Sequence, residues 1–190
     1  MNPVILVHGI NDTGARLDRL AAFLREQGRE TYSLDLAPSN GSEGLDRLAH
    51  QVAAFVGSNF ASNRRVDLVA FSMGGLVARY YLQRLGGIDR TDRLVTISTP
   101  HRGTMPALLS GKTGIRQMRP SSAFLRELNA DLSPLERLAF TSIWTPLDLM
   151  IVPANSSVLP VGRSHAVRVP AHVLMVYSPK VFALVGEALR

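Results

Sequence analysis

The chain has 190 residues, of which 46% are hydrophobic and 19% are charged, as is ordinary for a globular protein and unlike a disordered one. It contains no cysteine, which excludes disulfides, cysteine–zinc sites and thiol nucleophiles. The formal net charge is +6, but the basic residues are scattered and no basic stripe is interleaved with aromatic residues, so we expect no nucleic-acid partner. The length predicts a single domain that covers residues 1–190.

No apolar run reaches the roughly 18 residues that a transmembrane helix needs. The first residues, MNPVILVHGI, lack a basic segment before a brief apolar run, and this pattern is typical of a strand rather than of a signal peptide. We therefore expect a cytoplasmic protein by default, with a secreted mature form as the alternative.

Strand-like and helix-like segments alternate along the chain. The expected strands are short and rich in β-branched or aromatic residues: Val4–Val7, Thr31–Leu36, Val66–Phe71, Leu94–Ser98, Ala139–Trp144 and Ala166–Val169. The expected helices repeat apolar residues on one face: Ala15–Gln27, Glu43–Asn59, Met73–Leu85, Ser122–Asn129 and Pro179–Leu189. This alternation predicts an α/β fold, with about six mostly parallel strands and helices on both faces, whose ligands bind beyond the carboxyl ends of the strands.

The stretch Val66–Tyr81, VDLVAFSMGGLVARYY, places Ser72 between a buried-strand pattern and a helical pattern that follows it at once. A reversal from strand to helix within one residue strains the backbone and leaves room only for small neighbours, which are Ala70, Gly74 and Gly75. This pattern predicts a nucleophile elbow that exposes the Ser72 hydroxyl at the top of the sheet. The alternative is a helix-capping serine with glycines for close packing.

A second serine matches the same short pattern but not its context. Ser39 lies in APSNG, where Pro38 precedes the serine and the helical pattern begins only near Glu43. Nothing forces a sharp turn from strand to helix there, so we interpret Ser39 as a loop residue.

Several motifs around this serine resemble those of α/β-hydrolases. AFSMGG resembles their elbow, in the variant of small lidless bacterial lipases in which alanine replaces the first glycine, and PVILVHGIND is similar to their first strand and His-Gly loop. LVTISTPHRGT resembles the strand and turn after the elbow helix, and VPAHVLMVYSPKVFALVGEAL resembles the region around the catalytic histidine. The resemblance implies a minimal α/β-hydrolase fold, a serine carboxylic ester hydrolase of esterase or lipase type, an ester or lipid substrate, and no cofactor.

A serine nucleophile needs a histidine base. Of the five histidines, His50 lies within a helical pattern, His8 is suited to bracing the His-Gly loop, and His165 precedes the last expected strand, at the wrong edge of the sheet. The order of the triad in this fold is serine, acid, histidine, which leaves room for an acid before His172. The resemblance also assigns the catalytic position to His172, and we expect His101 to shape the wall of the pocket.

The acid is expected at Asp148, because this aspartate follows the strand Ala139–Trp144 at its carboxyl end. Its neighbours are apolar, and a buried carboxylate without a partner is costly. Asp131 is the second candidate, and a turn or N-cap role is the alternative for Asp148. The resemblance favours Asp148.

An oxyanion hole is also required, because acyl transfer passes through a tetrahedral oxyanion. In this fold one donor is the backbone N–H after the nucleophile, here Met73, and the other comes from the His-Gly loop, here Ile10. Many lipases have His-Gly-x-Gly in this loop, whereas this chain continues from Ile10 to Asn11 and Asp12.

The Gly- and Pro-punctuated stretch from Thr99 to Pro120 mixes apolar with basic residues: Met105, Leu108, Leu109, Ile115 and Met118 among Arg102, Lys112, Arg116 and Arg119. It suits an acyl pocket or a peripheral contact with a lipid interface, and an ordinary surface loop is the alternative. The chain has no spare length for a large lid.

Other functional readings have weaker support. Gly111–Thr113 (GKT) lacks both the upstream glycine and the preceding strand of a phosphate-binding loop, and no spacing of histidines and carboxylates suggests a metal site. A thioesterase, amidase or acyltransferase would use the same triad, and a non-catalytic binding protein on the hydrolase scaffold is a further alternative. Acyl-chain length and oligomeric state have no signal in the sequence.

Overall fold

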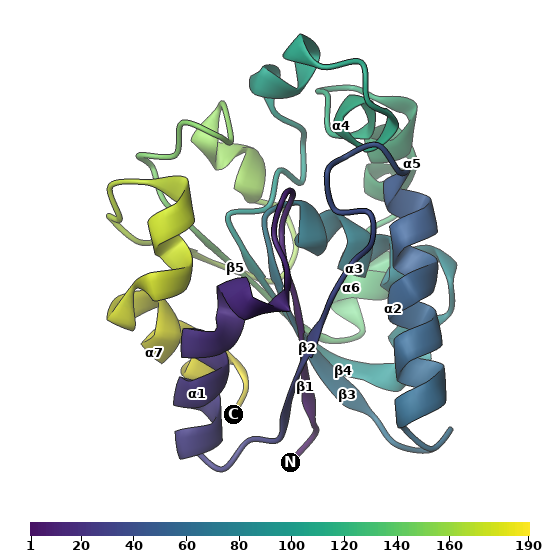
Figure 1. Cartoon of the computed structure of the whole chain (residues 1–190), viewed down its shortest axis with the longest axis vertical. Helices are drawn as coiled ribbons and strands as arrows, with labels where there is room; N and C mark the ends of the chain where they lie inside the picture. The colour runs from purple at the N-terminus through teal and green to yellow at the C-terminus, as the bar shows by residue number, and fades with distance from the viewer.

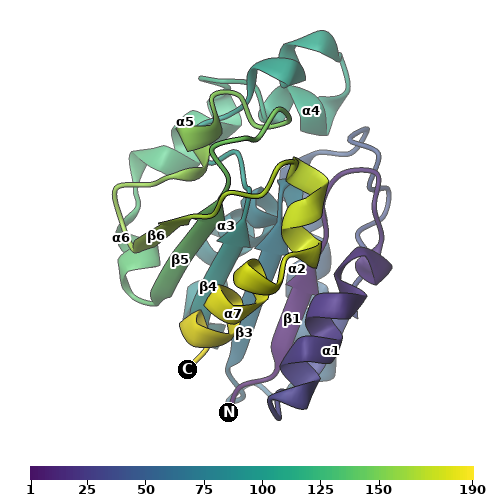
Figure 2. The ribbon, with the colours of Figure 1, turned by 90° about the vertical axis from the view of Figure 1, so that its left-hand side faces the viewer.

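A computed structural model describes residues 1–190 as one parallel six-stranded sheet between two layers of helices (Figures 1 and 2). The strands are β1 (Val4–Val7), β2 (Thr31–Leu34), β3 (Val66–Phe71), β4 (Thr91–Ile97), β5 (Ala139–Trp144) and β6 (Arg163–Ala166). They lie in the order β2-β1-β3-β4-β5-β6, and every neighbouring pair is parallel. The predicted α/β class is therefore confirmed.

The helices are α1 (Asp18–Glu26), α2 (Leu45–Asn59), α3 (Met73–Arg84), α4 (Thr113–Gln117), α5 (Ala123–Ala130), α6 (Ser133–Glu136) and α7 (Pro179–Ala188). Short 3-10 helices connect them: η1 (Gly14–Leu17), η2 (Gly87–Arg90), η3 (Met105–Leu109), η4 (Ala154–Ser157) and η5 (His172–Tyr177). The longest helix, α2, has 15 residues, and no helix combines the length and the hydropathy that crossing a membrane requires.

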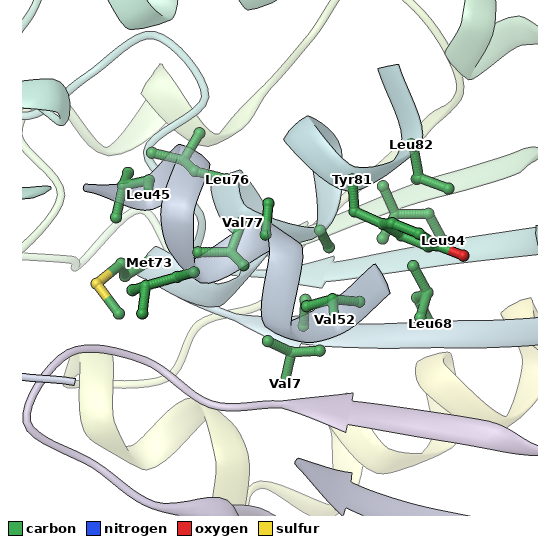
Figure 3. Packing of buried hydrophobic residues seen from close by; sticks show 14 of the residues in the cluster. Val7, Leu45, Val52, Leu68, Met73, Leu76, Val77, Tyr81, Leu82 and Leu94 are labelled. Carbon is green, nitrogen blue, oxygen red and sulfur yellow. The ribbon is translucent and has the colours of Figure 1, made fainter. Parts of the chain in front are cut away.

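The sheet separates two apolar cores because successive side chains of a strand point to opposite faces. In β1, Ile5 and Val7 join a cluster of 27 buried residues, whereas Val4 and Leu6 join a second cluster of 18. The larger cluster lies beneath α2, α3 and α5, and Figure 3 shows the side chains of α2 and α3 packed against the strands. The smaller cluster lies beneath α1 and α7, which are side by side in Figures 1 and 2.

The chain builds the sheet outward from β1, first on one side with β2 and then on the other side with β3. From β1 the chain crosses by α1 to the edge strand β2, returns over the opposite face by α2, and enters β3 on the other side of β1. The loops that leave β1 and β3 therefore go to opposite faces, and this divergence opens a crevice at their carboxyl ends. The residues after β1 and β3 are His8 to Asn11 and Ser72.

Three predicted strands have other bounds in the structure. β2 ends at Leu34 rather than at the predicted Leu36. β4 begins at Thr91, before the predicted Leu94, and the last strand is Arg163–Ala166 rather than Ala166–Val169. β6 is an edge strand with only β5 as a neighbour, so it tolerates the polar sequence RSHA, whereas Val167 and Val169 lie past it with their side chains in the smaller core. The apolar pattern of Ala166–Val169 therefore indicates buried side chains rather than strand pairing. His165 lies inside β6 instead of before it.

Candidate active site

Ser72 is the single residue between β3 and α3, and its backbone has φ 53° and ψ −123°. A residue other than glycine rarely adopts this conformation, which costs of order 1–3 kcal/mol. The Ser72 N–H donates to the carbonyl oxygen of Ile97 in β4 at 2.8 Å, which ties the turn to the sheet. The predicted sharp turn from strand to helix is therefore present.

The glycines after Ser72 are required by close contacts. A Cβ at Gly74 would lie 2.4 Å from the carbonyl oxygen of His8 and 2.6 Å from that of Val7, and a Cβ at Gly75 would lie 2.0 Å from Thr99 Oγ1. No real Cβ makes contacts this short. The first turn of α3 is therefore pressed against the end of β1, as the small residues predicted.

Hydrogen bonds connect Ser72, His172 and Asp148. His172 is the first residue of η5, and its Nε2 lies 3.0 Å from Ser72 Oγ, while its Nδ1 lies 2.8 Å from Asp148 Oδ2. All three side chains are buried, and the ring of His172 also packs on Phe71 with 4.9 Å between centroids. The structure thus brings together three residues from three separate loops at the carboxyl edge of the sheet.

The Asp148 carboxylate has a partner at each oxygen. Oδ1 accepts the N–H groups of Met150 and Ile151, both at 2.9 Å, and Oδ2 faces His172. Burial opposes ionisation of this carboxyl, but the hydrogen bond and charge of His172 and the two N–H groups outweigh it, so the pKa of Asp148 lies below its ordinary value of 3.8. The carboxylate is ionised at neutral pH.

The ionised carboxylate determines the tautomer of His172, because it can only accept hydrogen bonds. The Nδ1–H of His172 therefore donates to Asp148, and the neutral Nε2 accepts from the Ser72 hydroxyl. This arrangement leaves a basic nitrogen at the serine.

The expected oxyanion donors are the backbone N–H groups of Met73, which follows Ser72, and of Ile10, which lines the same cleft as Ser72. Met73 is the first residue of α3, where an N–H has no partner within the helix. The Ile10 N–H donates no hydrogen bond within the chain, and Gly9 lies so close that a Cβ there would be 3.1 Å from the Cβ of Ser72. The next residue anchors this loop, because the Asn11 N–H donates to the carbonyl oxygen of Ser39 at 2.9 Å.

The Ser72 side chain opens into an apolar cleft of about 230 Å³. The cleft is lined mainly by aliphatic residues of the loops after β1, β4 and β5: Ile10, Pro106, Ala107, Ile115, Met118, Met150 and Ile151. A larger hollow of about 720 Å³ lies between η3, α4 and α5, but none of the three hydrogen-bonded residues lines it. The smaller cleft is therefore the candidate substrate site.

The remaining histidines have structural positions. His8 is buried, donating from Nδ1 to the carbonyl oxygen of Gly9 and accepting the N–H of Leu36 at Nε2, which confirms that it braces the His-Gly loop. His50 is exposed on α2. The expectation that His101 shapes the pocket wall is wrong.

His101 lies inside the larger core rather than on the cleft. Its Nε2 is 3.0 Å from Thr96 Oγ1 and its Nδ1 is 3.4 Å from Nη1 of the buried Arg79. No sequence pattern indicates this pair, because it depends on how α3 packs over β4. The second acid candidate, Asp131, is exposed and bonds Ser133, so it is outside the site.

Thr145 is a residue that the sequence reasoning missed. Its buried hydroxyl donates to the carbonyl oxygen of Val169 at 2.7 Å and accepts the N–H of Leu147 at 3.2 Å. It thereby fastens the loop that carries Asp148 to the segment that leads to His172. A hydroxyl directly after a predicted strand is the only signal that could have pointed to it.

Comparisons with known proteins identify the family and the fold. The sequence model of the palmitoyl protein thioesterase family matches residues 3–136, which is well over half of the chain. The chain belongs to this family of α/β-hydrolases. Lysosomal thioesterase PPT2 of Homo sapiens is 30% identical over 105 residues, which are 53% of this chain and 34% of that protein.

Solved structures show the same fold at low sequence identity. Aspergillus fumigatus lipase B superposes with a TM-score of 0.87 at 20% identity, over 99% of this chain and 52% of that one. The mature form of Bacillus licheniformis lipase BlEst2 superposes with a TM-score of 0.76 at 16% identity, over 99% and 91%. This chain thus spans about half of the Aspergillus lipase, and its match to the human thioesterase covers about a third of that protein.

Proposed function

We propose that this chain is a serine hydrolase that cleaves carboxylic acyl esters through a covalent acyl-enzyme on Ser72. The observation that carries the proposal is the continuous line of hydrogen bonds from Asp148 through His172 to the Ser72 hydroxyl, at the edge of an apolar cleft. A capping serine would not need a histidine and an ionised carboxylate behind it, so the alternative role of Ser72 is disfavoured.

In the first half of the reaction, Ser72 Oγ attacks the acyl carbonyl carbon while its proton moves to His172 Nε2. Asp148 stabilises the resulting imidazolium and holds the ring in place. The carbonyl oxygen becomes an oxyanion that accepts the N–H groups of Ile10 and Met73. When the carbonyl re-forms, the bond to the leaving alcohol breaks, and the alcohol takes the proton from His172.

In the second half, water attacks the acyl-enzyme. His172 accepts one proton of the water, the same N–H groups hold the second oxyanion, and collapse releases the carboxylic acid and returns the proton to Ser72. The aliphatic lining of the cleft favours the acyl chain over water in this site.

Thioesters are the second candidate substrate class, and membership of the palmitoyl protein thioesterase family favours them. A thiol has a pKa near 8.5, far below that of an alcohol, so a thiolate leaves with less need for a proton from His172. The same triad therefore serves both leaving groups. Rates on an ester and a thioester of the same acyl chain, with the matched amide as a third substrate, separate these activities.

The proposal is tested by mass spectrometry after reaction with a fluorophosphonate probe. We expect one label, on the peptide that contains Ser72, and hydrolysis of a short acyl ester that disappears in Ser72→Ala. Ser39→Ala is the matched control, since Ser39 lies in the second copy of the short motif, and it should label and hydrolyse as the parent does. Labelling elsewhere, or unchanged turnover by Ser72→Ala, would refute the proposal.

A further inference from the structure

Exposed large hydrophobic residues gather at one end of the molecule. Eight of the nine such residues lie in η3, in the loop after β5, or at the start of η5: Met105, Leu108, Leu109, Leu147, Leu149, Met150, Val173 and Leu174, here called the apolar rim. Leu109 is 91% exposed and Leu149 is 83% exposed, and a contiguous patch of exposed apolar side chains commonly marks an interaction site. All three segments follow the carboxyl ends of strands, and the teal region of η3 lies at the top of Figure 1.

Hydrogen bonds join the three segments into one surface. The hydroxyl of Thr104 donates to the carbonyl oxygen of Met150 at 2.8 Å and accepts the N–H of Val152 at 2.9 Å, so η3 is fastened to the loop after β5. That loop is connected to the start of η5 by the bond between Asp148 and His172. The rim also borders the candidate substrate cleft, because Met150 belongs to both.

The segment that contains η3 also contains cationic residues without ion pairs. The segment from Thr99 to Ser122 contains four basic residues and no acidic one: Arg102, Lys112, Arg116 and Arg119. None of the four forms an ion pair within the chain.

The loop after β5 and the start of η5 likewise belong to a part of the chain with few acidic residues. Asp148 is the single acid between residues 145 and 180, and it is buried against His172. Arg168 and Lys180 are exposed and line a hollow beside Leu174. Other acidic residues at this end lie outside these segments: Asp12 is paired with Arg16, and Asp46 and Glu127 line the same hollow as Arg116 and Arg119.

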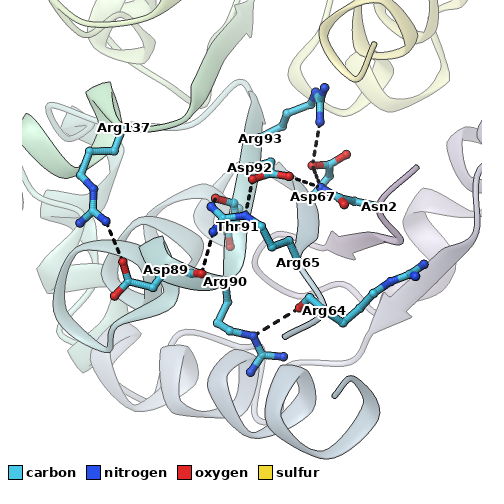
Figure 4. A network of polar contacts seen from close by, with 10 residues as sticks. All are labelled: Asn2, Arg64, Arg65, Asp67, Asp89, Arg90, Thr91, Asp92, Arg93 and Arg137. Carbon is cyan, nitrogen blue, oxygen red and sulfur yellow. Dashed lines mark hydrogen bonds and ion pairs between the residues drawn. The ribbon is translucent and has the colours of Figure 1, made fainter. Parts of the chain in front are cut away.

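At the opposite pole of the molecule, arginines lie beside aspartates. Figure 4 shows the network there, in which Arg137 pairs with Asp89 at 2.7 Å and Arg65 pairs with Asp92. Arg93 reaches the buried Asp67 in the same network. The segments of the apolar rim, 99–122 and 145–180, by contrast contain only one acid among their cations, the buried Asp148.

We propose that the apolar rim and its cations form a docking face for the surface of an anionic lipid bilayer. Exposed aliphatic side chains insert at the boundary of headgroups and acyl chains, and the unpaired cations are attracted to anionic headgroups. Docking in this orientation directs the mouth of the cleft toward the membrane, where long acyl chains reside. The inference rests on the proposed function only for the identity of what enters the cleft.

The test is flotation of the protein with phosphatidylcholine vesicles and with vesicles that also contain phosphatidylserine. We expect the parent chain to float with the anionic vesicles, to float less with the zwitterionic ones, and to lose binding as salt is raised. The double variant Leu109→Ser with Leu149→Ser should bind on the order of tenfold more weakly. Neutralisation by Lys112→Gln with Arg116→Gln should remove the preference for the anionic vesicles.

Matched controls lie on exposed positions away from this face. Ala22→Ser with Ala61→Ser, and Arg25→Gln with Arg64→Gln, should bind as the parent does. All four double variants should hydrolyse a short water-soluble ester at the parent rate, because none of these residues lines the cleft. Ser72→Ala should lose hydrolysis but keep vesicle binding, which separates failure of this inference from failure of the proposed function.

Three results would overturn the docking face. The parent chain could fail to float with either vesicle, or the rim variants could float as the parent does. Light scattering could instead show that the parent self-associates through the rim, with binding to vesicles absent and with the leucine variants monomeric. In that case the face would be an interface between copies of the chain.

Discussion

The two carboxylate oxygens of Asp148 have different hydrogen-bond partners: one accepts two backbone N–H groups and the other faces His172. An asparagine at this position must turn its NH₂ group either toward the ring Nδ1–H or toward the two N–H groups. The first choice forces the other tautomer of His172, with a proton on Nε2, and the second leaves donors facing donors.

Asp148→Asn should therefore lower kcat by about 10⁴ while the fold is retained, because His172 can no longer accept the serine proton. Steady-state kinetics on a soluble short-chain ester measure this effect, and circular dichroism monitors the fold. Asp131→Asn, at an exposed acid outside the site, is the control and should leave kcat near the parent value. Parent-like kcat in Asp148→Asn would remove this aspartate from the mechanism.

The predicted role of Ile10 depends on its backbone, not on its side chain. Ile10→Val retains the N–H and should keep most of the activity. Ile10→Pro deletes the N–H and should lower kcat by roughly 10²–10³, the usual effect of losing one oxyanion donor. Near-normal turnover by the proline variant would show that another group holds the oxyanion.

At the scale of elements, the contact between α3 and β1 links stability to the site. Gly74→Ala would push a methyl group into the carbonyl oxygens of Val7 and His8, and the loop after β1 would have to move with Ile10. We expect urea unfolding to show a loss of about 1–3 kcal/mol, together with a lower kcat.

Gly57→Ala is the matched substitution, because Gly57 lies inside α2 with open space around its Cα. It should stabilise the chain by up to about 1 kcal/mol through helix propensity, without changing kcat. If Gly74→Ala behaved like Gly57→Ala, the close packing at the elbow would not be what holds the loop.

The bounds of the strands show which structural features a sequence pattern can predict. The central strand β3 and the strand β5 have the predicted bounds, because a buried strand is a short apolar run between turn signals. β6 was displaced by several residues, since apolar residues mark burial rather than strand pairing, and Val167 and Val169 are buried without being in the sheet. The turn η5 could not be foreseen from a segment that is apolar almost throughout.

The residues of the candidate site also differ in how far the sequence alone could identify them. Ser72 could be singled out locally, because the turn and its small neighbours are adjacent in sequence. The proximity of Asp148 and His172 depends on the tertiary structure. Their prediction therefore relied on the positions of the strand ends, the order of the triad along the chain and the family resemblance. His101 was misplaced because its surroundings are set by Arg79 of α3, far from it in sequence.

At the scale of the whole molecule, the pair of Arg79 and His101 makes stability depend on pH. Arg79 is fully buried and donates to Asn129 and to the carbonyl oxygen of Leu128, with no carboxylate beside it; burial, with a smaller effect of Arg84, lowers its pKa to about 9. Burial first, and then the charge of Arg79, hold the pKa of His101 well below its ordinary value of 6.5.

Below pH 6.5 the unfolded chain therefore binds a proton at His101 that the folded chain does not, so acid favours unfolding. We expect the free energy of unfolding to fall by up to about 1.4 kcal/mol per pH unit as the pH drops below 6.5. Urea titrations over this range measure the slope, and His101→Gln should reduce it by the contribution of one proton. The exposed His50→Gln should leave the slope as it is, and an unchanged slope in His101→Gln would contradict the assignment.

The bond between Ser72 and His172 spans 100 residues of sequence. During translation, Ser72 emerges from the ribosome long before His172 has been made, so under the proposed mechanism the nascent chain carries an inert serine. Hydrolytic competence arises only when the last strands are in place and η5 has docked. Under that mechanism, hydrolysis begins only after His172 has been synthesised and its ring has reached Ser72.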